Sequence, residues 1–320
     1  MAVYTPVDAA ALAAFLARYD VGTAVSCKGI AEGVENSNYL VETTRGRFIL
    51  TLYEKRVDAA ELPYFLALMT HCADAGLPVP RPVPDREGKA LQVLAGRPAC
   101  LIEFVLGVSV TEPSPAECRA AGVALGRLHT ATANFAGQRP NGLGQTSWAP
   151  LAASCAGQLD GIAPGLEALV AGEVAALARD WPSHLERTNI HADLFPDNVL
   201  LLDGAVTGII DFYFACTDIR AYDLAVTHTA WAFGNDGRGF DPARAAALVE
   251  GYRSAHPLSD AEIAALPVLC RGSALRFTLT RAYDWLNTPK DALVTRKDPM
   301  AFARRLEWYA AATAAQVLGG

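Results

Sequence analysis

Hydrophobic and polar positions alternate in the first third of the chain and recur with helical spacing in most of the remainder. Residues 21–53 contain two extended runs around a polar break at residues 43–46, which predicts two strands and a turn. Alternation in the second run divides its side chains between two faces, with Phe48, Leu50 and Leu52 on one and Ile49, Thr51 and Tyr53 on the other. Residues 89–95 and 98–106 predict further strands.

Capping signals predict the helices and their starts. Thr5 and Pro6 predict a helix near the N-terminus, and Asp58 with Glu61 resembles a capping box for a second helix. The proline-rich residues 77–85 are typical of an extended connector. Further helices are predicted at residues 114–132, 164–180, 241–254, 259–286 and 298–317, and residues 134–150 are predicted to form a loop. With a length of 320 residues, this order predicts an α+β protein of about two domains.

Composition and charge exclude several classes of protein. The chain is 52% hydrophobic and 19% charged, which is enough apolar material for a core and unlike a disordered chain. Lys plus Arg is 27 and Asp plus Glu is 34, so the net charge is −7, which argues against a chain-wide basic surface for nucleic acid. Only five of the basic residues are lysines.

The ends and the cysteines indicate a cytoplasmic protein. No apolar run is long enough to span a membrane, and the N-terminus has neither the basic start nor the cleavage site of a signal peptide. The seven cysteines are widely spaced without a CxxC pair, so we expect free, buried thiols. We therefore expect no membrane partner and no nucleic-acid partner.

The most informative chemistry lies at residues 189–224. Asp203 and Gly204 separate two apolar runs, which predicts a tight hairpin because both residues tolerate positive φ. Folding that hairpin brings Asn198, before its first strand, close to Asp211, at the end of its second. Two oxygen ligands then converge where Mg²⁺ can bind, and Asp193 is left to face a substrate.

This layout suits phosphoryl transfer, in which a cation neutralises the phosphates and a separate carboxylate accepts the proton of the attacking hydroxyl. The protein-kinase catalytic loop has the form H-x-D-x-x-x-x-N, followed by a metal-binding Asp after a short hairpin. His191, Asp193, Asn198 and Asp211 occupy those places here. We expect His191 to support the loop through hydrogen bonds rather than to react.

The same residues have purely structural alternatives. Asp193 and Asn198 are of types that commonly form turns, although the complete set with its hairpin favours chemistry. Asp218 and Asp223 follow the hairpin. They either cap the next helix, anchor the loop or belong to the site, and we assign them, with His191, to structural support.

With these motifs, the sequence resembles the aminoglycoside phosphotransferase and choline kinase-like superfamily of small-molecule kinases, which have a protein-kinase-like fold. Within it, the sequence is most similar to the bacterial homoserine kinase family in KGIAEGVENSNYLVETTRGRFILTLYEKR, IHADLFPDNV, GIIDFYFACTD, YDLA and LTRAYDWLNTP. The resemblance covers nearly the whole chain. It implies a nucleotide-binding N-lobe with an antiparallel sheet and a helix at residues 1–105, and a mainly helical C-lobe with a catalytic hairpin at 106–320.

The resemblance implies ATP and Mg²⁺ as cofactors. Asp193 would be the catalytic base, and Asn198 and Asp211 would hold Mg²⁺. Residues 33–38 would cover the nucleotide and residues 102–105 would form the hinge, although an ordinary turn and a buried strand are alternatives. The implied ATP-binding residues are Gly33, Ser37, Asn38, Thr51, Glu103 and Val105.

One position departs from the protein-kinase pattern. There the third strand presents a lysine to the α- and β-phosphates, paired with a helix glutamate. The corresponding residue in RFILTLYEKR is Thr51, and Glu61 is either the helix glutamate or only a capping residue. Lys28, Lys55 or Arg56 could supply the missing charge.

The resemblance implies homoserine as the phosphoryl acceptor, for threonine biosynthesis. An amino-acid substrate needs a partner for its carboxylate, and arginine binds carboxylates bidentately. Arg281 and Asp284 share a helix face with Trp285 beside them, and the alternative for the first two is a surface ion pair. Tyr213, after Asp211, lines the pocket or packs in the core.

Two other functions remain as alternatives. A choline or ethanolamine kinase needs aromatic faces around a cation and no carboxylate partner. The aromatic residues available for this are Tyr213, Tyr222, Trp231 and Trp285. A kinase-like binding protein without catalysis is the second alternative; the complete catalytic set argues against it and the absent strand lysine argues for it.

Overall fold

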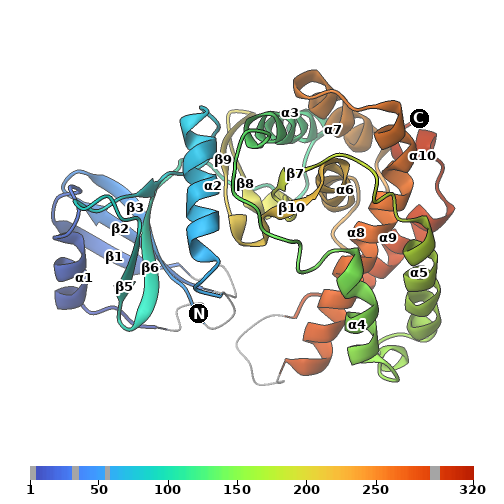
Figure 1. The fold of residues 1–320 in the computed structure, drawn as a ribbon, viewed down its shortest axis with the longest axis horizontal. Helices are drawn as coiled ribbons and strands as arrows, with labels where there is room; N and C mark the ends of the chain where they lie inside the picture. The colour runs from blue at the N-terminus through green and yellow to red at the C-terminus, as the bar shows by residue number, and fades with distance from the viewer. Residues whose placement is uncertain (1–4, 31–35, 55–57, 289–295) are drawn as a thin grey trace. The chain divides into compact units, whose positions relative to one another are not determined.

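The computed structural model describes residues 5–30, 36–54, 58–288 and 296–320. The chain divides into two compact units, Met1–Leu106 and Gly107–Gly320, which we call the N-unit and the C-unit (Figure 1).

An antiparallel sheet of six strands forms the N-unit, in the order β1-β2-β3-β6-β4 with β5 also pairing with β6 (Figure 1). The strands are Ala24–Gly29 (β1), Ser37–Thr43 (β2), Gly46–Leu52 (β3), Pro82–Val83 (β4), Leu91–Leu94 (β5) and Arg97–Glu103 (β6). The turn between β2 and β3 lies at the predicted polar break. The first extended run holds two strands rather than one, because alternation alone does not mark where one strand ends.

The core face of the sheet follows the predicted alternation. Leu50 and Leu52 of β3 belong to one buried cluster together with Phe15 and Leu16 of helix α1 (Ala9–Leu16), and Phe48 packs against that cluster. Burial of these side chains is the main stabilising contribution to the N-unit.

Both N-unit helices begin later than predicted. Asp8, not Thr5, caps α1, since its carboxylate accepts the backbone N–H of Ala11 at 2.7 Å. Helix α2 is Leu62–Asp74 and not a helix from Asp58, whose carboxylate instead accepts the N–H of Ala60 in the preceding turn. A proline in the first turn of α2 suits this start, because those N–H groups have no partner within a helix.

The C-unit is mainly helical and carries two short strand pairs. Its helices are Pro115–Thr132 (α3), Gln145–Cys155 (α4), Leu166–Asp180 (α5), Arg220–Trp231 (α6), Pro242–Ala255 (α7), Asp260–Asn287 (α8), Met300–Ala311 (α9) and Ala314–Val317 (α10). Its strands are Arg187–Ile190 (β7), paired with Cys216–Ile219 (β10), and Val199–Leu202 (β8), paired with Ala205–Ile209 (β9).

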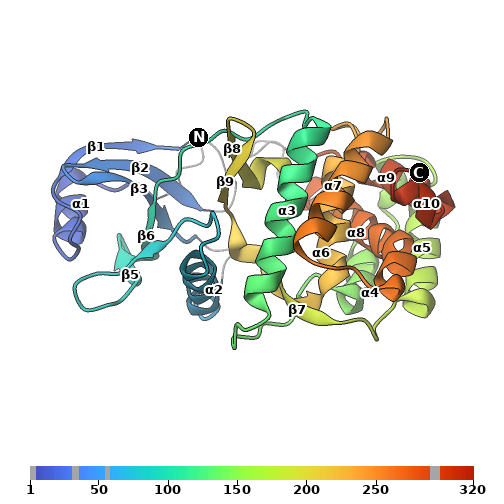
Figure 2. The same ribbon diagram turned by 90° about the horizontal axis from the view of Figure 1, so that it is seen from above.

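Helices α3 and α7 run side by side (Figures 1 and 2). They approach so closely that a Cβ at Gly122 would lie 2.1 Å from the carbonyl oxygen of Leu248. The predicted capping box that begins α3 is present, with Ser114 and Glu117 bonding to each other's backbone N–H groups. The box of Ser259 and Glu262 that begins α8 is present as well.

The helix predicted at residues 298–317 is divided into α9 and α10, and two helices were given no bounds by the sequence. Helix α4 begins inside the predicted loop 134–150, contains Pro150 and continues to Cys155. It is held by the buried Trp148, which packs edge-on against Trp181 with 4.9 Å between the ring centres. Helix α6 follows the hairpin, and every one of its residues is buried. A helix buried on all sides has no polar face, so its sequence lacks the periodic pattern of a surface helix.

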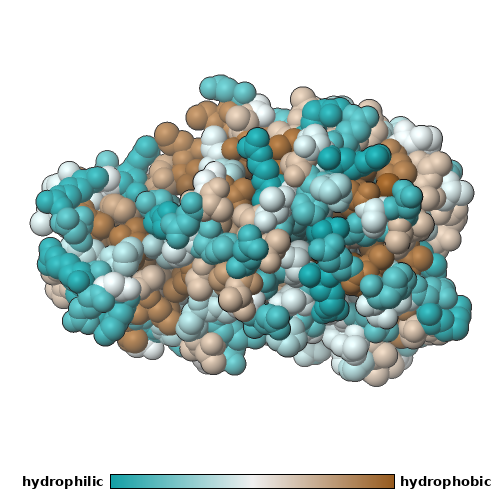
Figure 3. Space-filling model, turned by 45° about the horizontal axis from the view of Figure 1, so that its top comes forward, coloured by the Kyte–Doolittle hydropathy of each residue, from teal (hydrophilic) through white to brown (hydrophobic). Residues whose placement is uncertain are grey.

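None of the helices within the described ranges is long and apolar enough to cross a membrane. The face in Figure 3 shows hydrophilic side chains between separate hydrophobic areas. All seven cysteines are free, and six are buried as expected, whereas Cys27 on β1 is exposed.

Candidate active site

The predicted hairpin is formed by β8 and β9. Asp203 and Gly204 form its turn, with φ angles of 51° and 79°. The backbone N–H of Ile210 donates to the carbonyl oxygen of Asn198 at 3.0 Å. Asn198 and Asp211 are therefore neighbours at the open end of the hairpin, as the sequence predicted.

Asn198 is also tied to Asp193. Its side-chain amide donates to the backbone carbonyl of Asp193 at 2.8 Å and to the Asp193 carboxylate at 3.3 Å. Because the amide nitrogen is used in these bonds, the amide oxygen of Asn198 is the atom left to bind a cation. The hairpin thus brings together the three residues that the sequence assigned to catalysis and metal binding.

Asp211 is exposed and has a left-handed backbone, with φ of 65°. An amide oxygen and a carboxylate are hard donors of the kind that Mg²⁺ prefers. Within the described part of the chain, no group of three or more His, Cys, Asp or Glu side chains could hold a metal. The residues therefore fit a cation that takes further oxygen ligands from a bound phosphate or from water.

His191 supports the loop that carries Asp193. Its Nε2–H donates to the carbonyl of Ile210 at 2.9 Å, and its Nδ1 accepts the backbone N–H of Asp193 at 3.3 Å. Complete burial lowers the pKa of His191, so the ring stays neutral, which matches one donating and one accepting nitrogen. The ring thereby connects the loop at Asp193 with the end of the hairpin.

Asp223 of α6 anchors the backbone of the same loop. Its carboxylate accepts the N–H groups of His191 and Ala192, each at 2.7 Å, and contacts Nε2 of His129 at 3.0 Å. Asp218 holds a different segment of the chain. Its carboxylate accepts a hydrogen bond from the side-chain amide of Asn141 at 2.7 Å and forms an ion pair with Arg187.

Arg276 of α8 also contacts this loop. It is 2% exposed, donates to the carbonyl of Ala192, and lies 4.0 Å from the Asp193 carboxylate. The sequence offered the helix that carries Arg276 for the substrate, but it assigned the carboxylate to Arg281 and gave Arg276 no role at the loop. The signal was present, because Arg276 lies between apolar residues in a helix, and arginine is rarely buried without a partner.

Two further arginines lie beside Phe302. The guanidinium of Arg281 is 4.4 Å from the ring centre and that of Arg305, from α9, is 4.3 Å from it. Burial lowers the pKa of each to about 10; the nearby Asp193 carboxylate opposes this shift for Arg281, and the charge of Arg281 adds to it for Arg305. Arg281 also donates to the carbonyl of Asp298 at 3.3 Å.

The other residues that the sequence predicted to bind the substrate lie on α8 and directly after the hairpin. Trp285 is half-buried under the guanidinium of Arg296, 4.6 Å from its ring centre. Asp284 precedes it and is also half-buried. Tyr213 lies half-buried in the short helical turn Phe212–Phe214, directly after Asp211.

In the N-unit, the predicted nucleotide-binding side chains on β2 and β3 make hydrogen bonds within that unit. Thr51 is buried, and its hydroxyl donates to the side-chain oxygen of Asn38 on the neighbouring strand at 2.8 Å. The hydroxyl of Ser37 donates to Glu54 at 2.7 Å, and Glu54 pairs with Arg97 at 3.1 Å.

The remaining N-unit predictions lie on β1, at or just after the end of β6, or outside the described residues. Glu103 ends β6 and is exposed, and Val105 follows half-buried. Lys28 is exposed on β1. Gly33, Lys55 and Arg56 lie outside the described residues.

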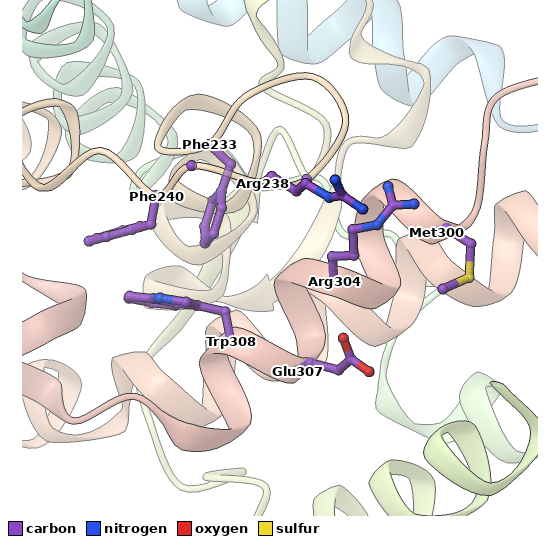
Figure 4. A pocket seen from close by; sticks show the side chains of 9 residues that line it. Phe233, Arg238, Phe240, Met300, Arg304, Glu307 and Trp308 are labelled. Atoms are coloured by element: carbon purple, nitrogen blue, oxygen red, sulfur yellow. The ribbon is translucent and has the colours of Figure 1, made fainter. Parts of the chain in front are cut away.

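A cavity of about 500 Å³ lies on another face of α9 (Figure 4). The guanidinium groups of Arg238 and Arg304 lie together on one side of it, and Phe240 stacks on Trp308 at 4.0 Å on the other. Its lining includes none of Asp193, Asn198 and Asp211, so the candidate chemistry lies elsewhere in the C-unit.

A unit built on an antiparallel sheet, followed by a helical unit with a catalytic-loop hairpin, is the arrangement of kinase-like phosphotransferases. Residues 26–258 match the model of the phosphotransferase enzyme family. The chain therefore belongs to that family, and it is a kinase with an alcohol group as acceptor.

Full-length relatives agree with this assignment. The chain is 54% identical to the homoserine kinase of Gluconobacter oxydans over 98% of this chain and 99% of that one. It is 52% identical to the homoserine kinase of Xanthobacter autotrophicus over 100% of this chain and 99% of that one.

Solved structures show the same fold at low sequence identity. An amicoumacin kinase in complex with AMP-PNP, Ca²⁺ and Ami superposes with a TM-score of 0.71 at 18% identity, over 96% of this chain and 95% of that one. A microcompartment-associated aminopropanol kinase superposes with a TM-score of 0.65 at 22% identity, over 95% and 94%. The predicted protein-kinase-like α+β fold is thus confirmed.

Proposed function

We propose that this protein transfers the γ-phosphoryl group of ATP to the side-chain hydroxyl of L-homoserine, a step in threonine biosynthesis. Relatives named homoserine kinase match at 52–54% identity over nearly the whole length, which supports this substrate. The structural observation that carries the proposal is the arginine charge around Asp193.

An acceptor that carries a carboxylate suits this charge better than one that is only cationic. Arg276 lies 4.0 Å from the Asp193 carboxylate, and the half-buried Arg281 is close enough to feel the same negative charge. Arg305 adds a third guanidinium beside Arg281. A partly desolvated guanidinium gains from binding a carboxylate, so homoserine would be held through its carboxylate at Arg281.

The same contacts disfavour choline or ethanolamine. Tyr222 and Trp231, two of the aromatic residues available for a cation cage, are fully buried, and Arg296 covers Trp285. A substrate cation would also be repelled by the neighbouring arginines. Tyr213, Asp284 and Trp285 remain candidate contacts for the rest of homoserine.

In the proposed mechanism, the Asp193 carboxylate accepts the proton of the homoserine hydroxyl as its oxygen attacks the γ-phosphorus in line, with no phosphoenzyme. The side-chain amide of Asn198 and the ring of His191 hold Asp193 in place for this step. Mg²⁺ held by Asn198 and Asp211 would neutralise the phosphate charge.

The N-unit would bind the nucleotide. We propose that Gly33, Ser37, Asn38 and Thr51 lie along the phosphates and that Glu103 and Val105 lie along the adenine. The hydroxyl of Thr51 and the side chain of Asn38 are joined, so Thr51 would orient Asn38 where protein kinases have a lysine. The phosphates would then depend on Mg²⁺, backbone N–H groups and a basic residue nearby.

A coupled ADP-release assay over homoserine, choline, ethanolamine, methylthioribose and an aminoglycoside tests the substrate. We expect turnover with homoserine alone. Arg281→Gln should raise the KM for homoserine about tenfold or more with little change in the KM for ATP. Arg271→Gln is the matched control, because Arg271 lies on the same helix but pairs with Glu173. Turnover of choline but not of homoserine would refute the proposal.

A further inference from the structure

The backbone of the catalytic loop is unusual at the residue before Asp193. Ala192 has φ of 63°, a left-handed conformation that residues with a side chain rarely adopt. Such a conformation persists only where the surroundings hold it on several sides. Asp223 holds the N–H side of Ala192, at 2.7 Å.

Arg276 holds the carbonyl side of the same residue. One terminal nitrogen of its guanidinium donates to the carbonyl oxygen of Ala192, and the other lies 4.0 Å from the carboxylate of Asp193. Protein kinases carry an arginine between the His and the Asp of this loop. Here that position is Ala192, and a guanidinium reaches the loop from α8 instead.

The packing of Arg276 joins this loop to the segment that follows the hairpin. Its guanidinium lies 4.5 Å from the ring centre of Phe277, on its own helix, and 5.5 Å from that of Phe214, three residues after Asp211. Arg276 therefore contacts both segments that carry the proposed base and the proposed metal ligand.

Stability alone does not explain an arginine at this place. Its Nε is buried and has no hydrogen-bond partner within the described part of the chain, and an unpartnered buried polar atom is destabilising. An apolar side chain of similar size would fill the same volume without this cost. An apolar side chain would fill this place but could not make the contacts to Ala192 and Asp193.

We propose that Arg276 is a positioning residue for phosphoryl transfer, which fixes the direction of the Asp193 carboxylate through the Ala192 carbonyl and through its own charge. It is only 2% exposed, so it acts through Asp193 rather than by binding the acceptor. The proposal depends on the proposed role of Asp193 as the base.

The test compares Arg276→Ala, Arg276→Lys and Arg276→Met with Arg271→Ala, which removes an arginine from the same helix outside the site. Arg276→Ala should lower kcat about a hundredfold, because small displacements of a reacting group have effects of this size. The affinity for Mg-ATP should stay within about threefold of the wild type, since the nucleotide does not depend on this contact. Arg276→Met should keep the wild-type Tm and still lose kcat.

Chemical rescue separates positioning from a merely structural role. Guanidinium chloride, far below concentrations that unfold proteins, should restore kcat of Arg276→Ala about tenfold and leave Arg271→Ala unchanged. Arg276→Lys should retain an intermediate kcat, because an ammonium supplies the charge without the fork.

Two results would overturn the proposal. One is a kcat of Arg276→Ala within about twofold of the wild type. The other is a loss of kcat that guanidinium does not restore and that is accompanied by a lower Tm and a weaker affinity for Mg-ATP. All assays use the acceptor that the wild type turns over. If the wild type does not phosphorylate homoserine, the proposed substrate is wrong but this test of Arg276 can still be made. If Asp193→Asn is active, the proposed role of Asp193 as the base is wrong.

Discussion

The carboxylate of Asp223, on the buried helix α6, accepts the backbone N–H of Ala192 at 2.7 Å, although the two residues are 31 positions apart. It also accepts the N–H of His191. Burial by itself raises the pKa of the Asp223 carboxyl, but the hydrogen bond from His129 and the contacts with His191 bring it below its usual value. A buried anion therefore holds the loop that presents Asp193.

Asp223→Asn should weaken this anchor, because an asparagine has one acceptor oxygen where the loop uses two. We expect the free energy of unfolding to fall by about 2–4 kcal/mol and kcat to fall at least about tenfold. Asp241→Asn is the control. Asp241 also accepts two N–H groups, those of Ala243 and Arg244, but at the exposed start of α7. The anchoring role would be contradicted if Asp223→Asn and Asp241→Asn had the same free energy of unfolding in urea and the same turnover.

Asp193→Asn should remove the proposed base while keeping its shape. We expect kcat to fall by a factor of about 10²–10⁴, with the affinity for Mg-ATP nearly unchanged. Asp203→Asn makes the same chemical change in the turn of the hairpin, where asparagine is equally suitable, and should leave kcat at the wild-type value. Steady-state kinetics and calorimetry measure both quantities. Near-normal turnover of Asp193→Asn would exclude Asp193 as the base.

Asp211→Asn should weaken the binding of Mg-ATP about tenfold or more, because the proposed cation loses its only fully charged protein ligand. Asparagine tolerates the left-handed backbone at this position, so the fold should be kept. Titration calorimetry with ATP, with and without Mg²⁺, makes the measurement. The affinity for metal-free ATP serves as the internal control. An unchanged affinity for Mg-ATP would count against a metal at Asp211.

His228 predicts a loss of stability in acid. Its ring is completely buried between the Tyr309 hydroxyl and the Val317 carbonyl, and burial lowers its pKa to about 4. An unfolded histidine has a pKa of about 6.5, so below that pH the unfolded chain binds a proton that the folded chain does not. The contribution of His228 to folding stability is therefore fully present above about pH 6.5 and is lost as the pH falls. The loss from this group amounts to about 3 kcal/mol near pH 4.

His228→Gln isolates this effect. A glutamine can donate to Val317 and accept from Tyr309 without titrating. The difference in unfolding free energy between wild type and variant should shrink or reverse between pH 7 and pH 4, measured by urea unfolding. Parallel pH dependences of the two proteins would mean that His228 does not stay neutral when folded.

Local sequence signals predicted those helices and strands that are stabilised by interactions between residues close together in the chain. Ser114 and Glu117 predict the start of α3 because a capping box satisfies its own backbone groups. Asp203 and Gly204 predict the hairpin because the turn depends on two backbone conformations. Helix α4 depends instead on Trp148 packing against Trp181, and a contact between residues so far apart leaves no local pattern.

The site shows the same division. By itself, the sequence determined the order of Asp193, Asn198 and Asp211 around a hairpin and the family to which they belong, because spacing and turn chemistry are local properties. Only the tertiary structure decided what holds the loop: Asp223 and Arg276 reach Ala192 from two different helices. Their burial makes those charges effective, and burial arises from packing of the whole C-unit rather than from any one segment.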